Sequence, residues 1–581
     1  MVLKVPEPHE LEKELNEYLT KKYGNRIRLA TPMVIPQKDE DIIDQGSEQH
    51  KQSKKITFDL KPEELESYLN EFVVKQEDPK EVLATKICTH FNRIKYRETY
   101  TRSETSDRVG MIKNNIIMIG PTGVGKTYLI KLIAKKIGVP FVKGDATKFS
   151  ETGYVGGDVD DLVRDLVHEA EGDIERAQYG IIYIDEIDKI ASGSNAIGVD
   201  VSRTGVQRGL LKPMEETEVD LKVPHDIVSQ MEAMEHFRRT GQKERRVINT
   251  KDILFIVSGA FNGLADIISK RVNREGIGFR ADPQRRDSGA ECLKMVTPED
   301  LMHYGFESEF IGRLPVITAF VPLKTDDLYR ILKNLNSAVI NSKKQDFKSY
   351  GIDVRFEDEA LYAIAERACA HTTGARALVS VVEKVLMKFE KTLPSTAIKR
   401  LVVTKEIVDN PARELALLLD AGESKEQRAR YLGVVKREKD DLRELIMQRK
   451  KSFPLKHQEL LSGARTHLIV NRVVDTGSHL TVVLEEILAL LEDTRNYEAS
   501  FFEKTGIKIY FHERAADRLV EQVLKQGVPL EVYCNTLFKS YHHGLNLVRE
   551  KSGTSEFILG REAITDPEGY LDKLIKASYD N

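Results

Sequence analysis

The segment Gly120–Thr127 constrains what this chain folds into more than any other part of the sequence. It reads GPTGVGKT, a complete match to the glycine-rich loop pattern that ends in Gly-Lys-Thr. An apolar run, Ile116–Ile119, leads into the loop and an amphipathic run, Thr127–Ile137, leaves it, which predicts a strand–loop–helix unit. In such a unit the glycines let backbone N–H groups turn toward phosphate oxygens, and the helix amino terminus adds positive potential. The segment therefore predicts a nucleotide-phosphate site.

The chemistry expected at this loop depends on its last residues. We expect Lys126 to reach the β- and γ-phosphates of ATP, and the Thr127 hydroxyl to bind Mg²⁺. The other nucleotide contacts expected here are Gly120, Pro121, Thr122, Gly123, Val124, Gly125 and Tyr128.

Two adjacent carboxylates, Asp185 and Glu186, directly follow the apolar run Gly180–Ile184. A buried acid without a partner costs free energy, so the pair needs a task or a partner. We expect Asp185 to support Mg²⁺ and Glu186 to orient and polarise the water that attacks ATP. The alternative is that both acids cap the following helix. Together with the loop, the pair predicts ATP hydrolysis and not passive nucleotide binding.

The apolar runs indicate the fold class. Ile116–Ile119, Gly180–Ile184 and Ile253–Val257 lack polar alternation, which is typical of strands buried on both faces of a parallel sheet. From about Val321 the sequence becomes helix-dominated, which suggests a second unit. With 581 residues, the chain is also too long for a single core. We therefore predict an α/β protein of several units.

Composition and charge disfavour several classes of protein. Hydrophobic residues make up 41% of the chain and charged residues 31%, which fits a soluble protein rich in helix. The formal net charge is −4, without the basic surplus of a nucleic-acid binder. The amino terminus lacks the apolar core of a signal peptide, and no window approaches the ~18 apolar residues of a membrane span. We therefore expect a cytoplasmic protein that binds neither nucleic acid nor membrane.

The cysteines give no sign of a metal or disulfide framework. They lie far apart and form no CxxC pair; they are Cys88, Cys292, Cys369 and Cys534. We interpret them as core thiols and expect no zinc site.

The carboxyl-terminal part contains an internal repeat. The motif Gly351–Phe356 (GIDVRF) recurs as Gly506–Phe511 (GIKIYF), at an offset of 155 residues (506 − 351). We interpret the two segments as copies of one small α/β unit, of which the second has diverged. Chance similarity between amphipathic helices is the alternative.

The expected organisation has five parts. They are an amino-terminal extension and linker (1–55), a large ATPase domain (56–320), a small domain (321–415), a charged helical connector (416–500) and a second small-domain-like unit (501–581). The linker rests on the polar, aromatic-poor segment Gln37–Lys55, and the connector on its charged, periodic sequence.

A series of segments from about residue 56 to 415 resembles the ClpX family of AAA+ protein unfoldases, with some features of the related HslU family. Besides the loop, the matching segments are FVVKQ from Phe72, ATKFSETGYVGGDVDDLVRDL from Ala146, IIYIDEIDKI from Ile181, VSRTGVQRGLLK from Val201, LFIVSGAF from Leu254, EGIGF from Glu275, EFIGRLPV from Glu309 and TTGARAL from Thr372. So many ordered matches are far more specific than any one motif.

The resemblance implies a fold, an activity and an assembly. The fold is an AAA+ P-loop ATPase large domain with a parallel sheet, a small domain, and here a carboxyl-terminal helical extension ending in the diverged repeat. The implied assembly is a homo-hexamer that hydrolyses ATP to translocate protein substrates. Val73 and Val74 are expected beside the adenine.

The segment Gly153–Gly156 (GYVG) resembles the family's substrate-gripping pore loop. Tyr154 and Val155 between glycines make a mobile apolar paddle that can contact any polypeptide. The alternative is an ordinary turn with Tyr154 in the core.

Two arginines and a serine resemble residues that read the nucleotide. Arg313, in GRLP, is similar to the arginine finger that reaches the neighbouring subunit's γ-phosphate, a task suited to a forked, always-charged guanidinium. Arg376, in GAR, is similar to the second sensor of the small domain. Ser258 stands where the first sensor is expected. Surface ion pairs are the alternative for either arginine.

The tripeptide Ile277-Gly278-Phe279 matches the one with which these unfoldases dock onto a ClpP-like peptidase. An exposed Ile/Phe pair suits insertion into apolar pockets of a partner ring. A short turn packed on its own domain is the alternative, and Arg280 departs from the small residue of the family pattern.

The sequence departs from the family in three places. Residues 1–55 contain no cysteine, so the family's zinc-binding domain is not expected. A segment from about Lys222 to Asn249 stands in place of the basic substrate-entry loop, either as another entrance or as a solvated basic helix. In the second copy of the repeat Glu531 occupies the position of Arg376, and a carboxylate repels a triphosphate. We therefore expect this copy to serve assembly or partner binding.

Two other functions stay open beside the unfoldase. One is an AAA+ motor acting on nucleic acid, which needs a basic channel or reader module that the slightly acidic chain does not show. The other is an ATP-binding assembly scaffold in which the carboxyl-terminal extension dominates.

Overall fold

The computed structural model describes residues 58–100, 112–149, 158–192, 201–221, 246–275, 289–371, 373–450, 453–461 and 463–579. The chain divides into two units, residues 1–54 and 55–581, and the described residues all belong to the second. Within these ranges no helix has the length and apolar character needed to cross a membrane.

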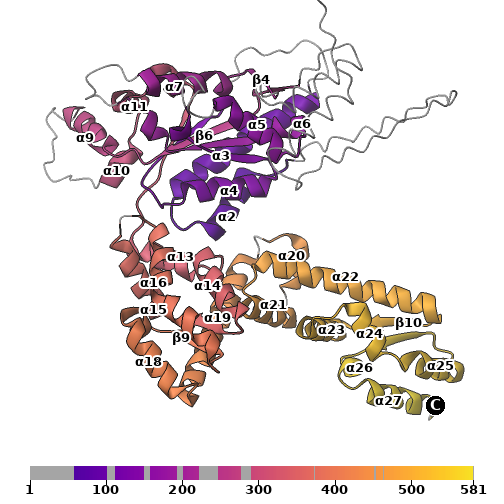
Figure 1. The fold of residues 1–581 in the computed structure, drawn as a ribbon. Helices are drawn as coiled ribbons and strands as arrows, with labels where there is room; N and C mark the ends of the chain where they lie inside the picture. The colour runs from indigo at the N-terminus through magenta and orange to yellow at the C-terminus, as the bar shows by residue number, and fades with distance from the viewer. Residues whose placement is uncertain are drawn as a thin grey trace, which may run out of the picture. The chain divides into compact units, whose positions relative to one another are not determined.

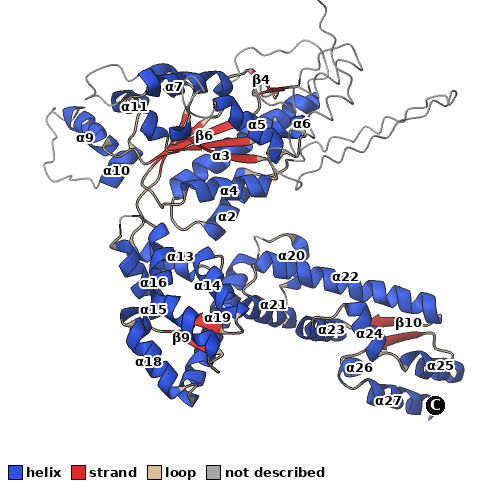
Figure 2. Ribbon diagram, in the orientation of Figure 1, coloured by secondary structure: helices blue, strands red, loops and turns tan. Residues whose placement is uncertain are grey.

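A five-stranded parallel sheet forms the centre of the amino-terminal half (Figures 1 and 2). Its strands are β1 (Ile116–Ile119), β2 (Phe141–Asp145), β3 (Ile181–Asp185), β6 (Leu254–Gly259) and β7 (Val316–Ala319). Their order is β2-β3-β6-β1-β7, and every neighbouring pair is parallel. The residues of β1 and β6 are all buried, as the absence of polar alternation predicts.

Helices cover both faces of this sheet (Figure 2). They are α2 (Pro62–Phe72), α3 (Glu77–Tyr100), α4 (Lys126–Ile137), α5 (Val159–Glu169), α6 (Ile174–Ala177), α7 (Val201–Met214), α9 (Leu264–Glu275), α10 (Gly289–Lys294), α11 (Pro298–Tyr304) and α12 (Ser308–Gly312). Alternate residues of the strands belong to two different core clusters. Ile116 and Met118 pack with α2, α3 and α4, whereas Ile117 and Ile119 pack with α5, α7 and α11. A short antiparallel pair, β4 (Glu218–Asp220) and β5 (Val247–Asn249), completes this half.

A second, smaller core follows the sheet domain along the chain. Its elements are α13 (Thr325–Lys333), α14 (Ala338–Ser349), β8 (Asp353–Phe356), α15 (Asp358–Cys369), α16 (Arg376–Thr392), β9 (Arg400–Val403), α17 (Lys405–Asp409) and α18 (Pro411–Ala421). Strands β8 and β9 form a two-stranded parallel sheet.

The carboxyl-terminal extension begins with helices and ends in a third α/β core. Its elements are α19 (Lys425–Arg449), α20 (Leu455–Leu460), α21 (Ala464–Thr476), α22 (Leu480–Thr505), β10 (Lys508–Phe511), α23 (Glu513–Gln526), α24 (Leu530–Leu537), α25 (Tyr541–Ser552), β11 (Glu556–Leu559), α26 (Glu562–Thr565) and α27 (Pro567–Tyr579).

The internal repeat appears as two units of the same connectivity. In each unit a left-handed glycine, Gly351 (φ 73°) or Gly506 (φ 67°), ends a helix before the first strand. After the first strand comes one helix, α15 or α23, and then a second helical segment, α16 or α24–α25. A second strand follows and pairs in parallel with the first. A short helix and a proline-initiated helix, at Pro411 or Pro567, close the unit. One difference is that the single helix α16 corresponds to two helices, α24 and α25.

Two expected domain boundaries, at residues 415 and 500, fall inside helices. Helix α18 continues to Ala421 and α22 to Thr505, each ended by a glycine of positive φ, Gly422 or Gly506. The amphipathic pattern persists until these glycines, which are the true stop signals.

Candidate nucleotide site

The glycine-rich loop joins the end of β1 to the start of α4. Gly120, Gly123 and Gly125 have φ angles of 152°, 76° and 98°, a range that favours glycine. A Cβ atom at Gly120 would lie 2.7 Å from the Cβ atom of Phe320, so this position has no room for a side chain. Gly125 is the N-cap of α4, which leaves the N–H groups of the first helical turn at the loop. The local sequence thus builds a backbone cradle that suits an anion.

Lys126 is the first residue of α4 and is buried. Its Nζ atom donates hydrogen bonds to the carbonyl oxygens of Gly120 and Pro121, the latter at 2.9 Å. Burial lowers the pKa of Lys126 to about 8; the Asp185 carboxylate opposes this shift, and Arg376 adds to it. The carbonyl oxygens that accept from the ammonium group are neutral, and phosphate oxygens are stronger partners.

Thr127 and Asp185, the two expected metal ligands, lie side by side. The Thr127 Oγ1 atom donates to Asp185 Oδ2 at 3.3 Å. Burial opposes ionisation of Asp185, but hydrogen bonds from Lys143 and Ser258 outweigh it and keep the pKa below its usual value. An alcohol oxygen beside an ionised carboxylate is the kind of donor set that Mg²⁺ takes. These two residues therefore fit a magnesium site next to the loop.

Three neighbouring side chains complete a polar network around Asp185. Ser258, expected as the first sensor, donates to Asp185 Oδ1 at 2.8 Å. Lys143 Nζ lies 2.9 Å from Asp185 Oδ2, and the buried Tyr183 hydroxyl lies 2.6 Å from Ser258 Oγ and 3.0 Å from Thr127 Oγ1. Lys143 and Tyr183 are not among the site residues expected from the sequence. Lys143 lies in the middle of β2 and reaches Asp185 only because β2 pairs with β3, which its own sequence does not indicate.

Glu186 presents an exposed carboxylate directly after β3. It adopts a left-handed conformation (φ 57°) and makes no side-chain cap hydrogen bond to the following 3₁₀ helix, Ile187–Ile190. Two neighbouring acids do bond to backbone: Asp185 Oδ1 accepts from the Glu186 N–H at 3.1 Å, and the buried Asp188 Oδ1 accepts from the Ala260 N–H at 3.2 Å. The capping alternative therefore does not describe Glu186, whose carboxylate is available to a water.

The expected adenine segment is fixed to the start of the small domain. Val73 is the buried C-cap of α2, and Val74 is half-buried. The buried Gln76 side chain donates to the Val321 carbonyl at 2.7 Å and accepts from the Val321 N–H at 3.0 Å. The two hydrogen bonds tie the segment to the chain between β7 and α13.

The turn before Arg376 touches the glycine-rich loop. The Ala375 N–H donates to the Gly123 carbonyl at 2.9 Å. A Cβ atom at Gly123 would lie 2.0 Å from the Thr373 carbonyl oxygen, and one at Gly374 would lie 2.9 Å from the Gly123 carbonyl oxygen. Only glycine fits on either side of this contact. Arg376 begins α16 directly after the turn, and its charge helps to lower the Lys126 pKa.

Arg313 lies away from the other expected site residues. It precedes β7, and its carbonyl accepts a hydrogen bond at 3.1 Å from Asn115, which precedes β1. The loop follows β1, and β1 and β7 are parallel. Arg313 is therefore at the amino-terminal edge of the sheet and Lys126 at the carboxyl edge. The half-exposed guanidinium forms an ion pair with Glu215 of the same chain.

Several expected residues lie outside the described ranges. These are the pore-loop residues Tyr154 and Val155, the docking residues Ile277, Gly278 and Phe279, and most of the segment 222–249. Tyr128, expected to contact nucleotide, is described and is 42% exposed on α4.

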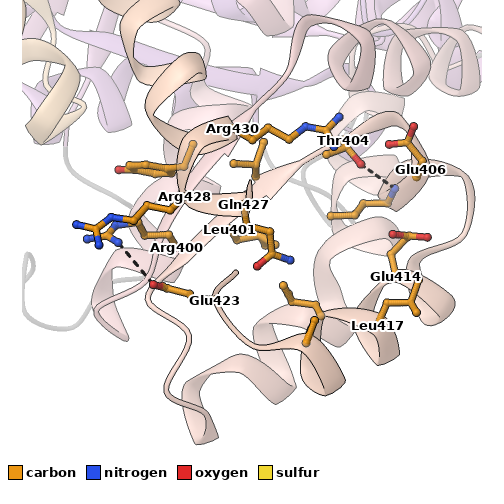
Figure 3. A pocket seen from close by; sticks show the side chains of 15 residues that line it. Arg400, Leu401, Thr404, Glu406, Glu414, Leu417, Glu423, Gln427, Arg428 and Arg430 are labelled. Atoms are coloured by element: carbon orange, nitrogen blue, oxygen red, sulfur yellow. Dashed lines mark hydrogen bonds and ion pairs between the residues drawn. The ribbon is translucent and has the colours of Figure 1, made fainter. Parts of the chain in front are cut away.

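A cavity of about 290 Å³ lies elsewhere, among β9, α17, α18 and the start of α19 (Figure 3). Its rim carries Arg400, Arg428 and Arg430, and two of these are already paired: Arg400 with Glu423, and Arg430 with Glu357. No residue of the glycine-rich loop lines it, so this cavity is separate from the nucleotide site.

Two family models match the described domains. Residues 112–317 match the AAA domain (Cdc48 subfamily), and residues 323–392 match the C-terminal, D2-small domain of ClpB protein. The first range contains the sheet and the loop, and the second contains the turn before Arg376.

Curated relatives match over a longer stretch. A protein of Borrelia duttonii named ATP-dependent Clp protease ATP-binding subunit ClpX is 40% identical over 360 residues, which is 61% of this chain and 80% of the relative. Proteins of the same name from Azotobacter vinelandii and Treponema denticola are 39% and 38% identical, over 74% and 81% of their own lengths.

Proposed function

Because this chain belongs to the ClpX family of AAA+ ATPases, we propose that it is an ATP-driven protein unfoldase whose catalytic site is the loop and strand-end network described above. The observation that carries the proposal is the joint placement of Lys126, Thr127, Asp185 and Glu186 at one edge of the parallel sheet. Nucleotide binding and ATP hydrolysis follow from the family. The roles of single residues are our inference.

The proposed roles follow from the contacts of each side chain. Lys126 exchanges its carbonyl partners for the β- and γ-phosphates, whose charge restores its protonated form. Thr127 and Asp185 hold Mg²⁺, which neutralises charge that develops on the phosphate oxygens. Glu186 accepts a hydrogen bond from the attacking water and orients it in line with the γ-phosphate. Lys143 shares Asp185 with the metal position and keeps that carboxylate ionised.

The nucleotide is proposed to lie between the large and small domains. Val73 and Val74 flank the adenine, and Arg376 approaches the phosphates from the turn that touches Gly123. Loss of the γ-phosphate then changes the position of this turn relative to the loop, and the small domain moves with it.

Arg313 is proposed to act on the site of a neighbouring subunit. Its position at the opposite edge of the sheet supports this role, because it is remote from Lys126 of its own chain. A guanidinium supplied by a neighbour makes hydrolysis depend on assembly, and we propose a homo-hexamer on the family pattern. In such a ring Tyr154 and Val155 would grip polypeptide in the axial channel.

A ClpP-like peptidase is the proposed partner of the ring. The relatives are named as subunits of an ATP-dependent Clp protease, and Ile277-Gly278-Phe279 is the segment that we propose for docking. Substrates delivered in this way would be unfolded before degradation.

The decisive experiment compares the wild-type protein with Glu186→Gln and with Glu175→Gln, an exposed acid on α6 as the matched control. We expect an unfolded protein, and not single-stranded DNA, to stimulate ATPase activity of the wild type and the control. Glu186→Gln should bind ATP with magnesium, fail to hydrolyse it and retain the unfolded protein. Stimulation by DNA alone would contradict the unfoldase. Normal hydrolysis by Glu186→Gln would contradict the assigned site.

A further inference from the structure

The second copy of the repeat leaves one face of its sheet open. In the parallel pair β10–β11, Lys508 lies opposite Glu556 and Tyr510 lies opposite Ile558. Side chains alternate along a strand, so these four residues share one face. Tyr510 and Ile558 are 45% and 69% exposed. The residues of the opposite face belong to the buried core.

Phe502, at the end of α22, extends this face. Its ring is 44% exposed, and Lys508 Nζ lies 5.8 Å from its centroid. Lys508 Nζ also lies 3.0 Å from Glu556 Oε1. We call this surface the open sheet face and define it by five residues: Phe502, Lys508, Tyr510, Glu556 and Ile558. It is an apolar patch beside one cation and one anion. Isolated exposed apolar residues need no explanation, but a contiguous set on one sheet face does.

The corresponding face of the first copy has the same register. In β8–β9, Asp353 lies opposite Arg400 and Arg355 lies opposite Val402. These positions match those of the second copy one by one in the repeat. The two copies thus present equivalent faces, and their surroundings can be compared directly.

A helix covers the face in the first copy. Helix α19 packs against both β8 and β9. Tyr431 on α19 donates to Asp353 Oδ2 at 2.7 Å, and Glu438 on α19 pairs with Arg355 at 2.6 Å. Arg355 is consequently only 4% exposed. Among the described residues, no helix packs closely on both strands: α22 and α23 pack on β10, and α27 (Pro567–Tyr579) reaches β11 through the Tyr570 hydroxyl, which donates to the Ile558 carbonyl at 3.2 Å.

We propose that the open sheet face binds an amphipathic α-helix of another protein, which lies across β10 and β11 as α19 lies across β8 and β9. Its apolar stripe contacts Phe502, Tyr510 and Ile558, one flanking acid faces Lys508, and one flanking base faces Glu556. In place of Arg355 the second copy has Tyr510, so this helix needs apolar contact where α19 supplies Glu438. Five residues form the face, against the roughly 20–30 residues a side of a standard interface, so binding is weak and reversible.

The chain offers a direct reporter for this helix because it contains no tryptophan. In the full-length protein, Tyr510→Trp places a single indole on the open sheet face. The probe is a synthetic amphipathic peptide of about 18 residues, enough for five helical turns, with a leucine stripe between acidic and basic flanks. A peptide of the same composition in scrambled order is the control. We expect saturable binding of the first peptide, with a blue shift of the indole emission.

Matched substitutions in the Tyr510→Trp protein test whether the face itself binds. Ile558→Asp should weaken peptide binding roughly tenfold or more, because it removes buried apolar area and adds a charge. Val482→Asp changes a residue near the start of α22 that is 60% exposed and lies 20 positions before Phe502, about 30 Å along the helix, and it should leave binding unchanged. Equal binding of the scrambled peptide, or full binding by Ile558→Asp, overturns the proposal. Indole emission that is already blue-shifted without peptide and changes with protein concentration overturns it too, because a second copy then covers the face.

Discussion

The two copies of the repeat share a fold but differ in what each one touches. The first copy contacts the glycine-rich loop through the turn at Gly374 and places Arg376 where it affects Lys126. The second copy has Glu531 at the equivalent position, and that carboxylate lies 3.5 Å from Lys504 on an exposed surface. The comparison teaches that the scaffold of strand, helices and parallel strand does not itself confer nucleotide sensing. Only the first copy carries the turn and the arginine that we propose for nucleotide sensing.

The largest expected effect comes from giving the first copy the residue of the second. Arg376→Glu places a carboxylate beside the phosphates and should lower kcat/KM for ATP roughly hundredfold or more. The reciprocal change Glu531→Arg should leave kcat/KM within about twofold, because we expect the second copy not to contact nucleotide. Steady-state ATPase assays on both variants test the pair. An equal loss in both would show that the copies are coupled at the site.

A smaller effect is expected from crowding the contact between loop and turn. Gly123→Ala adds a Cβ atom 2.0 Å from the Thr373 carbonyl oxygen at a φ of 76°, so the turn must move away. We expect ATP affinity to fall roughly tenfold, which corresponds to a loss of about 1.4 kcal/mol of binding free energy. Gly351→Ala is the control, because its φ of 73° is similar and no atom lies within 4 Å. It should cost about 1 kcal/mol of folding stability and leave nucleotide titrations unchanged.

The covered and open sheet faces should differ in stability. Val402→Asp puts a charge on the face under α19 and should lower the free energy of unfolding by about 1–2 kcal/mol. Ile558→Asp changes a side chain that is 69% exposed and should cost less than about 0.5 kcal/mol. Urea unfolding followed by circular dichroism measures both. Equal destabilisation would mean that the second face is covered in solution.

The smallest expected effect is a shift in pH dependence. Lys126 has a pKa of about 8 in the nucleotide-free site and binds phosphate as a cation, so ATP affinity should fall as the pH rises above about 8. Arg376 helps to lower this pKa, and Arg376→Ala should therefore move the decline to higher pH by less than about one unit. Glu531→Ala should not move it. Fluorescent-nucleotide titrations between about pH 7 and 9.5 detect the shift, and an unmoved midpoint in Arg376→Ala would contradict it.

Local sequence patterns predicted the elements that local physics determines. The strands at Ile116, Ile181 and Leu254 are apolar on both faces, so their burial in a parallel sheet follows from composition alone. The glycine-rich loop needs left-handed glycines at fixed offsets, which makes its sequence specific. The repeat was visible because Gly351 and Gly506 end helices in the same way before the same short strand.

Contacts between elements that are distant in the sequence could not be predicted from the sequence. Lys143 belongs to the site only because β2 pairs with β3, and nothing in its own neighbourhood indicates that pairing. The separation of Arg313 from Lys126 depends likewise on the parallel alignment of β1 and β7. The boundaries at residues 415 and 500 were set by a change in composition, whereas the helices run on to Gly422 and Gly506. The residues of the site were thus largely identifiable, but their neighbours across strands were not.

The position of Arg313 has a consequence for how neighbouring subunits would affect one another's nucleotide sites. Asn115 holds the Arg313 backbone at the amino-terminal edge of the sheet, and Lys126 lies at its carboxyl edge. Under the proposed arrangement each subunit reads the nucleotide of one neighbour and is read by the other. If the sheet tilts when nucleotide changes at its own phosphate site, Arg313 at the opposite edge moves relative to the phosphate site of the neighbouring subunit. Each hydrolysis event would therefore affect the next subunit in one direction around the ring only, because a head-to-tail interface joins two different surfaces of the subunits.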